Sequence, residues 1–116
     1  MSALLPTCDA VVFHGGSGTM LAALAAGVPM VMLPTAADQP ANADAVTLAG
    51  AGIALPPTAR DVDAVVGALG QVLNEPAYRE AARGIAGEIA AMPEPAALVP
   101  ALERLAAAGP EGALAA

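Results

Sequence analysis

The chain has 116 residues, a formal net charge of −7, and a composition in which 57% of residues are hydrophobic. This length suits one modest domain, and the hydrophobic fraction excludes a disordered acidic tail. Only four basic residues stand against eleven acidic ones, and the four do not cluster. A nucleic-acid-binding role is therefore excluded, because it requires grouped Lys and Arg side chains.

The features that indicate a cellular compartment favour the cytoplasm. A single cysteine, Cys8, excludes a disulfide framework and suits a reducing environment. The N-terminus has neither a basic segment nor a clean apolar one, so we expect no signal peptide. Residues 20–37 carry almost no polar side chains, but Gly27, Pro29 and Pro34 interrupt them. These breakers favour strands and loops over a membrane-spanning helix, so we expect a cytoplasmic protein without a membrane span.

Strands and helices are predicted to alternate through the first half of the chain. Residues 9–13 (DAVVF) and 28–33 (VPMVML) are apolar runs that predict buried strands. A helix is expected between them from Ser17 or Gly18, with Leu21, Leu24 and Ala25 at core spacing and Gly27 as its C-cap.

A second helix is expected to begin at Asp38, which stands where an N-cap belongs, and to stop at Gly50. Residues 52–55 then predict a short third strand. The next helix is expected to begin at a capping box formed by Thr58 and Asp61. Its predicted apolar face consists of Val62, Val65, Val66, Leu69, Val72 and Leu73.

Two more helices are predicted over about 76–91 and 96–108. Strands that alternate with helices predict an α/β fold with a Rossmann-like parallel sheet and right-handed crossovers. The first strand is apolar on both faces although it begins almost at the N-terminus, and a strand buried on both faces has neighbours on both sides. We therefore expect the second half of a doubly wound domain over residues 1–109, followed by a frayed tail over 110–116.

The segment between the first strand and helix reads HGGSGT, residues 14–19. A helix N-terminus binds anions, because its first amides have no partner within the helix and its dipole adds roughly half a positive charge. The glycines permit close backbone approach. Ser17 and Thr19 add hydroxyl donors, and His14 is expected to face the same crevice. The segment predicts a diphosphate site that needs no metal.

Other interpretations of these motifs are open. The glycines can serve only to turn a strand into a helix, with His14 as an ordinary core histidine. The spacing matches neither a mononucleotide P-loop nor the GxGxxG pattern of a nicotinamide site. Asp61 and Asp63 form a DxD pattern, a known metal-binding motif, but they stand at a helix start, where Asp is common. We expect capping there and no metal site.

The longer segment HGGSGTMLAALAAGVPMVMLP, followed by ADQPANA, resembles the donor-binding signature of the family 1 glycosyltransferases with the GT-B fold. It is most similar to the bacterial branch that decorates macrolides and other antibiotics, whose domain is called the erythromycin-type glycosyltransferase C-terminal domain. The segments LLPTCDAVV, AGAGIAL and MPEPAALVPALERLA fit as well, so the resemblance covers about residues 4–108.

The resemblance implies the second half of a GT-B C-terminal, donor-binding domain, and it implies roles for particular residues. Asp38 and Gln39 would hydrogen-bond hydroxyl groups of the donor sugar. No catalytic residue is expected in this chain, because the acceptor pocket and catalytic base of the family lie largely in an N-terminal domain. The last helix would pack back toward that domain. The residues implied to bind the diphosphate are His14, Gly16, Ser17, Gly18 and Thr19.

Two departures from the family pattern matter. Many relatives have two consecutive histidines before the glycines, whereas this chain has Phe13 and His14. Plant-type members also have a glutamate for the ribose hydroxyls at the position of Ala22. Its absence favours a donor with a 2-deoxyribose, such as a dTDP-sugar.

The implied activity is that of a hexosyltransferase that uses a dTDP- or UDP-sugar. The acceptor would be a hydroxyl group of a small lipophilic molecule, such as an antibiotic or another secondary metabolite, and no cofactor or metal is expected. The chain would need its N-terminal domain, or a separate partner that supplies it, to be active. The alternatives are a non-catalytic sugar-nucleotide-binding or interaction module, and a truncated inactive polypeptide.

Overall fold

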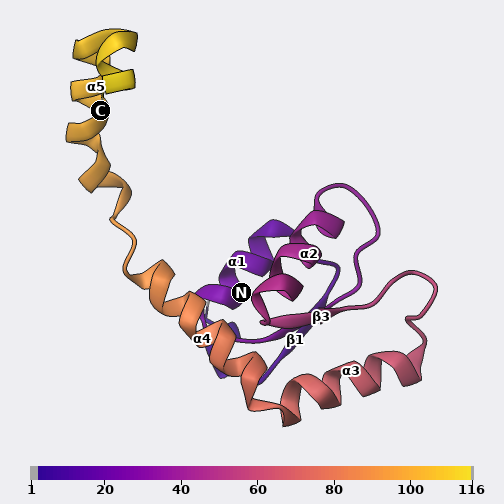
Figure 1. The fold of residues 1–116 in the computed structure, drawn as a ribbon. Coiled ribbons are helices and arrows are strands. Elements are labelled where there is room, and N and C mark those ends of the chain that lie inside the picture. Colours follow the sequence, from indigo (N-terminus) through magenta and orange to yellow (C-terminus); the bar gives the residue numbers. More distant parts are fainter. Residues whose placement is uncertain (1–2, 116) are drawn as a thin grey trace.

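A computed structural model describes the backbone of residues 3–115 and the side chains of residues 3–108. Its centre is a three-stranded parallel sheet in the order β1-β2-β3 (Figure 1). The strands are β1 (Val11–Phe13), β2 (Met30–Met32) and β3 (Gly52–Ala54). Helix α1 (Ser17–Ala25) connects β1 to β2, and α2 (Gln39–Ala49) connects β2 to β3. The predicted parallel α/β fold is confirmed.

The remaining elements flank this unit. A short 3-10 helix, η1 (Leu5–Thr7), precedes β1. After β3 come α3 (Val62–Asn74), α4 (Pro76–Ala90) and α5 (Pro95–Ala115). Helices α1, α2 and α4 pack into one hydrophobic cluster and α3 into another, so the sheet is covered on both faces.

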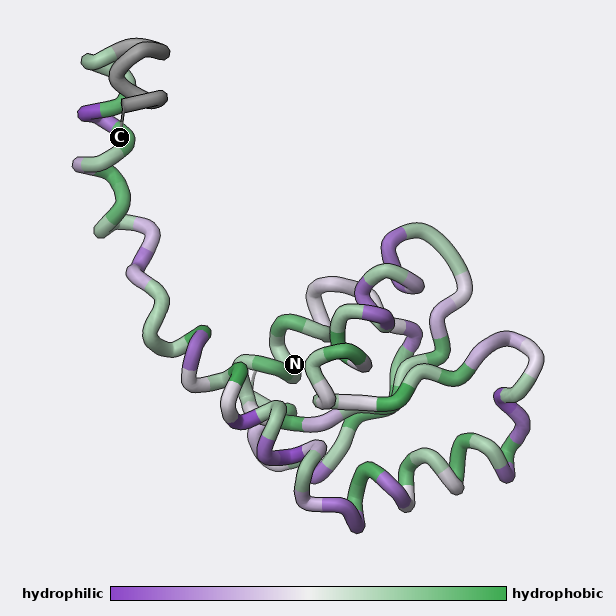
Figure 2. Tube along the Cα trace, viewed as in Figure 1, coloured by the Kyte–Doolittle hydropathy of each residue, from purple (hydrophilic) through white to green (hydrophobic). Residues whose placement is uncertain are grey.

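The central strand β2 joins the two hydrophobic clusters. Met30, Val31 and Met32 are each 0% exposed. The two methionines belong to the cluster with α1, α2 and α4, whereas Val31 packs against Ala68 and Val72 of α3. Successive side chains of a strand point to opposite faces, so this short strand supplies both cores. The strands in the middle of Figure 2 are accordingly coloured as hydrophobic.

Helices α1 and α2 both end at a glycine with left-handed backbone, as predicted. After α1, Gly27 has a φ of 70°, and the N–H of Val28 donates to the carbonyl of Ala23 at 2.9 Å. After α2, Gly50 has a φ of 81°, and Ala51 makes the same kind of bond five residues back. This is the Schellman arrangement, which directs the chain into the next strand.

Strand β1 differs from the prediction, because it is not buried on both faces. Val11 and Phe13 pack against the core, whereas Val12 between them is 40% exposed. Within residues 3–115, β1 pairs with β2 on one side and with no strand on the other. The β1 edge of the sheet is therefore unpaired within these residues, and the α3 cluster, which covers Val31, does not extend to Val12.

Two helix faces also differ from the prediction. Leu21 of α1 is 55% exposed and Ala25 is also exposed, whereas Leu24 is buried as predicted, together with Ala23. On α3, Val62, Val66 and Leu73 are 77%, 62% and 50% exposed. The apolar face of α3 is wider than its contact with the sheet, so only its inner part is covered.

Helix α5 projects away from the rest of the chain (Figure 1), and the molecule measures 58 × 28 × 23 Å. It runs to Ala115, beyond the predicted end near residue 108. The side chains of the expected tail, 110–116, lie outside the described residues, and the domain boundary stays a prediction, as does the packing of this helix on a partner domain. No helix within the described range is both long and apolar enough to cross a bilayer.

Candidate functional site

The glycine-rich segment lies at the carboxyl end of β1 and opens α1, as predicted. Gly16 occupies the N-cap with extended backbone, and no side chain caps the helix. Ser17, Gly18 and Thr19 form the first turn, so their amide groups have no acceptor within the helix. Ser17 and Gly18 are exposed. The result is an uncapped helix N-terminus that faces solvent and can bind an anion.

Gly15 turns the chain from β1 into this helix, and only glycine suits its position. Its backbone angle φ is 100°, a value that residues other than glycine rarely adopt. A Cβ atom added there would meet the carbonyl oxygen of Gln39 at 3.3 Å. The glycine loop therefore lies directly against the first residue of α2.

Asn42 fixes this contact, although the sequence analysis did not place it in the site. Its Nδ2 donates to the carbonyl oxygen of Gly15 at 3.0 Å, and the bond is partly buried. Asn42 stands one turn after Asp38 on α2, on the side of the helix that faces the loop. The four-residue spacing from Asp38 is a weak sequence signal that Asn42 lies near the site, since residues four apart share a helix face.

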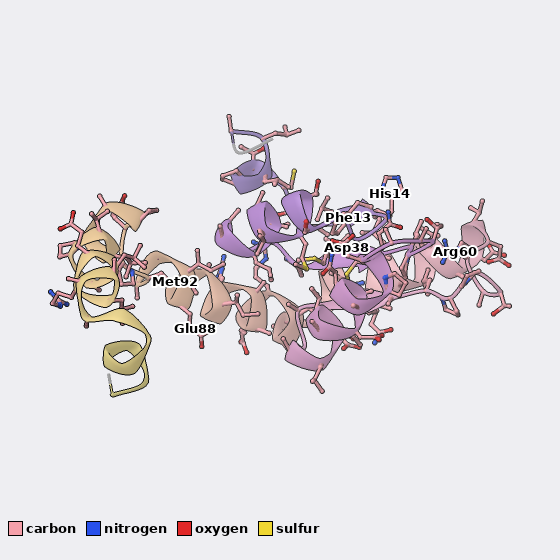
Figure 3. The ribbon with its side chains drawn as sticks, turned by 90° about the horizontal axis from the view of Figure 1, so that it is seen from above. Phe13, His14, Asp38, Arg60, Glu88 and Met92 are labelled. Atoms are coloured by element: carbon pink, nitrogen blue, oxygen red, sulfur yellow. The ribbon has the colours of Figure 1, made fainter. Side chains whose placement is uncertain are left out.

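His14 is exposed beside the loop, and Figure 3 shows its ring directed away from the body of the protein. The alternative interpretation of His14 as a core histidine is therefore wrong. Phe13, which precedes it, packs against the core cluster instead. An apolar side chain at position 13 thus fits its inward orientation, and the single histidine occupies the outward position next to the glycines.

Asp38 also lies exposed, at the N-cap of α2, but its carboxylate does not cap the helix. The carboxylate makes no hydrogen bond or ion pair with the part of the chain that the structure describes, although the backbone carbonyl accepts from the Asn42 backbone amide. The predicted helix start is confirmed, and the predicted capping by this side chain is wrong. Both carboxylate oxygens are consequently available to hydroxyl donors of a ligand.

Gln39 is partly occupied by its own loop. Its Oε1 accepts hydrogen bonds from the Thr35 amide at 3.0 Å, the Thr35 hydroxyl at 2.9 Å and the Ala36 amide at 3.3 Å. Because three donors converge on the oxygen, Nε2 is the atom that remains to contact a ligand. Between these residues, Ala37 has a φ of 58°, the one positive value for a non-glycine residue among those described.

Arg60 is a second residue near these loops that the sequence pattern did not predict. It is half-buried in the segment between β3 and α3, and its guanidinium donates to four backbone carbonyls. Two of these belong to residues after β2 and two to residues after β3. No residue pattern in the sequence predicts such contacts, because every peptide group carries the same acceptor.

The DxD pattern has a structural role. Asp61 is the N-cap of α3, and its Oδ1 accepts from the amide of Ala64 at 2.8 Å. The expected capping by Asp61 is confirmed. The predicted capping box and helix start at Thr58 are wrong, because Asp61 is itself the N-cap and α3 begins at Val62. In the described part of the chain, no three His, Cys, Asp or Glu side chains lie close enough to hold a metal ion.

Residues 1–105 match the family described as Erythromycin biosynthesis protein CIII-like, C-terminal domain. The chain belongs to this family, and its fold is part of the C-terminal domain of a GT-B glycosyltransferase. The family and fold predicted from the sequence are confirmed. The roles of individual residues stay predictions.

Named relatives extend this finding. The chain is 45% identical over 107 residues to 10-deoxymethynolide desosaminyltransferase of Streptomyces venezuelae, covering 92% of this chain and 25% of that protein. The solved glycosyltransferase VinC in complex with dTDP has a TM-score of 0.84 and 33% identity, covering 93% of this chain and 27% of that one.

The spinosyn rhamnosyltransferase SpnG, solved with spinosyn aglycone, has a TM-score of 0.82 and 39% identity, covering 88% of this chain and 28% of that one. The chain thus spans about a quarter of the length of the curated relatives it matches. It is homologous to glycosyltransferases over this part.

Proposed function

We propose that this chain supplies the diphosphate and donor-sugar contacts of a glycosyltransferase. The enzyme would transfer a sugar from a thymidine diphosphate sugar to a hydroxyl group of a small lipophilic acceptor, such as an antibiotic. One observation carries the proposal: the uncapped N-terminus of α1 lies against the start of α2, through Gly15 and Gln39. A nucleotide sugar needs such an anion site and sugar-binding polar groups side by side.

The residues divide the ligand between them. The amides of Ser17, Gly18 and Thr19 would bind phosphate oxygens, and His14 would donate a further hydrogen bond. These donors would also stabilise the negative charge that grows on the diphosphate as it leaves. They supply that charge stabilisation themselves, so the proposal includes no metal ion.

The sugar would lie at the start of α2. The free carboxylate of Asp38 would accept hydrogen bonds from sugar hydroxyls, and Nε2 of Gln39 would donate one. Because His14 lies on the leaving-group side, it is not proposed as the base that deprotonates the acceptor. That base and the acceptor pocket are proposed to belong to a part of the enzyme outside this chain.

Thymidine is the nucleoside that we favour over uridine. The relative VinC was solved with dTDP, and SpnG was also solved with thymidine diphosphate. Ala22 lies on α1 at the position where plant-type relatives carry a glutamate that binds the ribose hydroxyls. A 2-deoxyribose lacks one of these hydroxyls and so has less need of that glutamate. Both observations support the same donor class.

The test is calorimetric titration of the folded chain with dTDP, dTMP, UDP and a dTDP-sugar. We expect saturable binding that is tighter for dTDP than for dTMP or UDP, and tighter again for the dTDP-sugar. Loss of the His14 side chain in His14→Ala should weaken dTDP binding about tenfold, the size expected for a hydrogen bond to a charged group.

The matched control is Asp61→Ala. It lowers stability by about 1 kcal/mol through loss of a helix cap, but it should leave the affinity for dTDP unchanged. Equal affinity in the two variants, or a folded wild-type chain that binds no nucleotide, would contradict the proposed diphosphate site.

A further inference from the structure

We propose that Arg60 is a positioning residue for the donor-sugar contacts. Its guanidinium holds the segment between β2 and α2 in the shape that presents Asp38 and Gln39. The proposal rests on the proposed function of that site, and it adds a residue that neither the sequence motif nor the family resemblance identifies.

The hydrogen bonds of Arg60 join the ends of two strands. Nη1 donates to the carbonyl oxygen of Leu33 at 3.2 Å, and Nη2 donates to that of Pro34 at 2.7 Å. On the other side, Nη2 donates to Leu55 at 2.9 Å and Nε to Pro56 at 3.3 Å. One side chain thus ties the exit of β2 to the exit of β3 (the labelled Arg60 in Figure 3).

Arginine is the side chain that can make these contacts. Its planar guanidinium presents five N–H donors in a fixed arrangement, whereas the lysine ammonium is a point charge on a flexible stem. Hydrogen bonds from a charged donor are stronger than neutral ones. Among the described residues, the ion pair is formed by Arg79 with Asp9 and does not involve Arg60. The polar partners of the Arg60 guanidinium in this part of the chain are therefore all carbonyl oxygens.

The contacts reach the site through the loop that follows β2. Leu33 and Pro34 directly precede Thr35, whose amide and hydroxyl bind the Oε1 of Gln39. The loop is therefore held at its start by Arg60 and at its end by Gln39. Between the two anchors lies Ala37 in the left-handed region, a conformation that persists only when its surroundings hold it.

The glycine loop has a different support. Asn42 donates to the carbonyl of Gly15. Gln39 meets Gly15 with its backbone and Cβ and not with the side-chain amide group that binds Thr35. Arg60 makes no contact there among the described residues. A substitution at Arg60 should therefore disturb the sugar contacts and leave the diphosphate contacts intact. A general role in stability would instead affect both.

The first experiment compares the affinities of Arg60→Lys for dTDP and for a dTDP-sugar. We expect dTDP affinity within about twofold of wild type, and a loss of about tenfold in the affinity for the dTDP-sugar. Arg104→Lys, on exposed α5, is the matched control and should change neither. An unchanged preference for the dTDP-sugar, or equal losses for both ligands, would overturn the proposal.

A second variant and a second measurement guard against a folding defect. Arg60→Gln keeps a planar donor group without the charge. It should likewise reduce the affinity for the dTDP-sugar and leave the affinity for dTDP nearly unchanged. Amide hydrogen exchange needs no ligand: in either variant the amides of Thr35 and Ala36 should exchange at least about tenfold faster, while that of Val31 should not. Unchanged exchange at Thr35 and Ala36 would overturn the proposal.

These readings separate the two proposals. A folded wild-type chain that binds neither ligand refutes the proposed function, and the exchange measurement still decides the role of Arg60. A wild-type chain that binds both ligands, with an unaltered sugar preference in both Arg60 variants, refutes the role of Arg60 alone.

Discussion

Substitution of Asn42 by aspartate tests whether the two loops of the site form one structure. The amide of Asn42 donates a single, partly buried hydrogen bond of 3.0 Å to the carbonyl oxygen of Gly15. Aspartate has the same shape but lacks the donor, so it leaves that carbonyl without its partner. It also directs a carboxylate at the carbonyl oxygen and adds a negative charge beside an anion site.

The magnitude follows from these two effects. Loss of a neutral hydrogen bond that leaves a partly buried acceptor unsatisfied costs about 1–3 kcal/mol. Taking about 1.4 kcal/mol as the share that reaches the ligand gives about a tenfold loss of dTDP affinity. Asn42→Ala removes only the hydrogen bond, so the further loss in Asn42→Asp measures the effect of the charge.

The assay is titration calorimetry with dTDP, together with urea unfolding to measure the free energy of unfolding. Asn74→Asp is the matched control, because it adds the same charge at the exposed end of α3. We expect its dTDP affinity to equal that of wild type. If Asn42→Asp also binds dTDP as wild type does, the bond to Gly15 does not support the diphosphate loop and the reasoning is refuted.

Two further predictions concern the sheet and the sugar contacts. Gly52→Ala should lower the free energy of unfolding by about 3 kcal/mol, because its Cβ would overlap the Met30 carbonyl oxygen. Gly67→Ala, with nothing within 4 Å of the added Cβ, should raise it by about 0.5–1 kcal/mol. Urea unfolding of both variants checks this, and equal stabilities would contradict the packing of β3 on β2. Asp38→Asn should keep dTDP affinity but reduce dTDP-sugar affinity about tenfold, and parallel titrations that give equal losses for both ligands would remove Asp38 from the sugar site.

Much of the fold could be predicted because its determinants are local. The apolar runs of β1 and β2, and the glycines that end α1 and α2, each carry a pattern that short-range chemistry explains. Gly27 and Gly50 both have the left-handed backbone expected of them. The burial of individual side chains was harder to predict, since Val12 and Leu21 are exposed for reasons that depend on which neighbours are present.

The site could be predicted in part for the same reason. The segment around Gly15 and the start of α2 follow from motifs in the chain, but the contacts that fix them do not. Asn42 and Arg60 reach backbone carbonyls up to 27 residues away in the sequence. A carbonyl acceptor has no residue type, so a single sequence gives no signal for the contact of Arg60 and only the weak helix-face spacing for that of Asn42.

The contact between Gly15 and Gln39 has a consequence for selectivity. A Cβ at Gly15 would lie 3.3 Å from the Gln39 carbonyl oxygen, so the anion-binding loop and the start of α2 approach each other closely through their backbones. The span between them is thus set by the backbone and not by the ligand. On the proposed function, we expect a sugar joined through a single phosphate to reach both ends less well than one joined through a diphosphate. Discrimination by linkage length would then require no additional side chain.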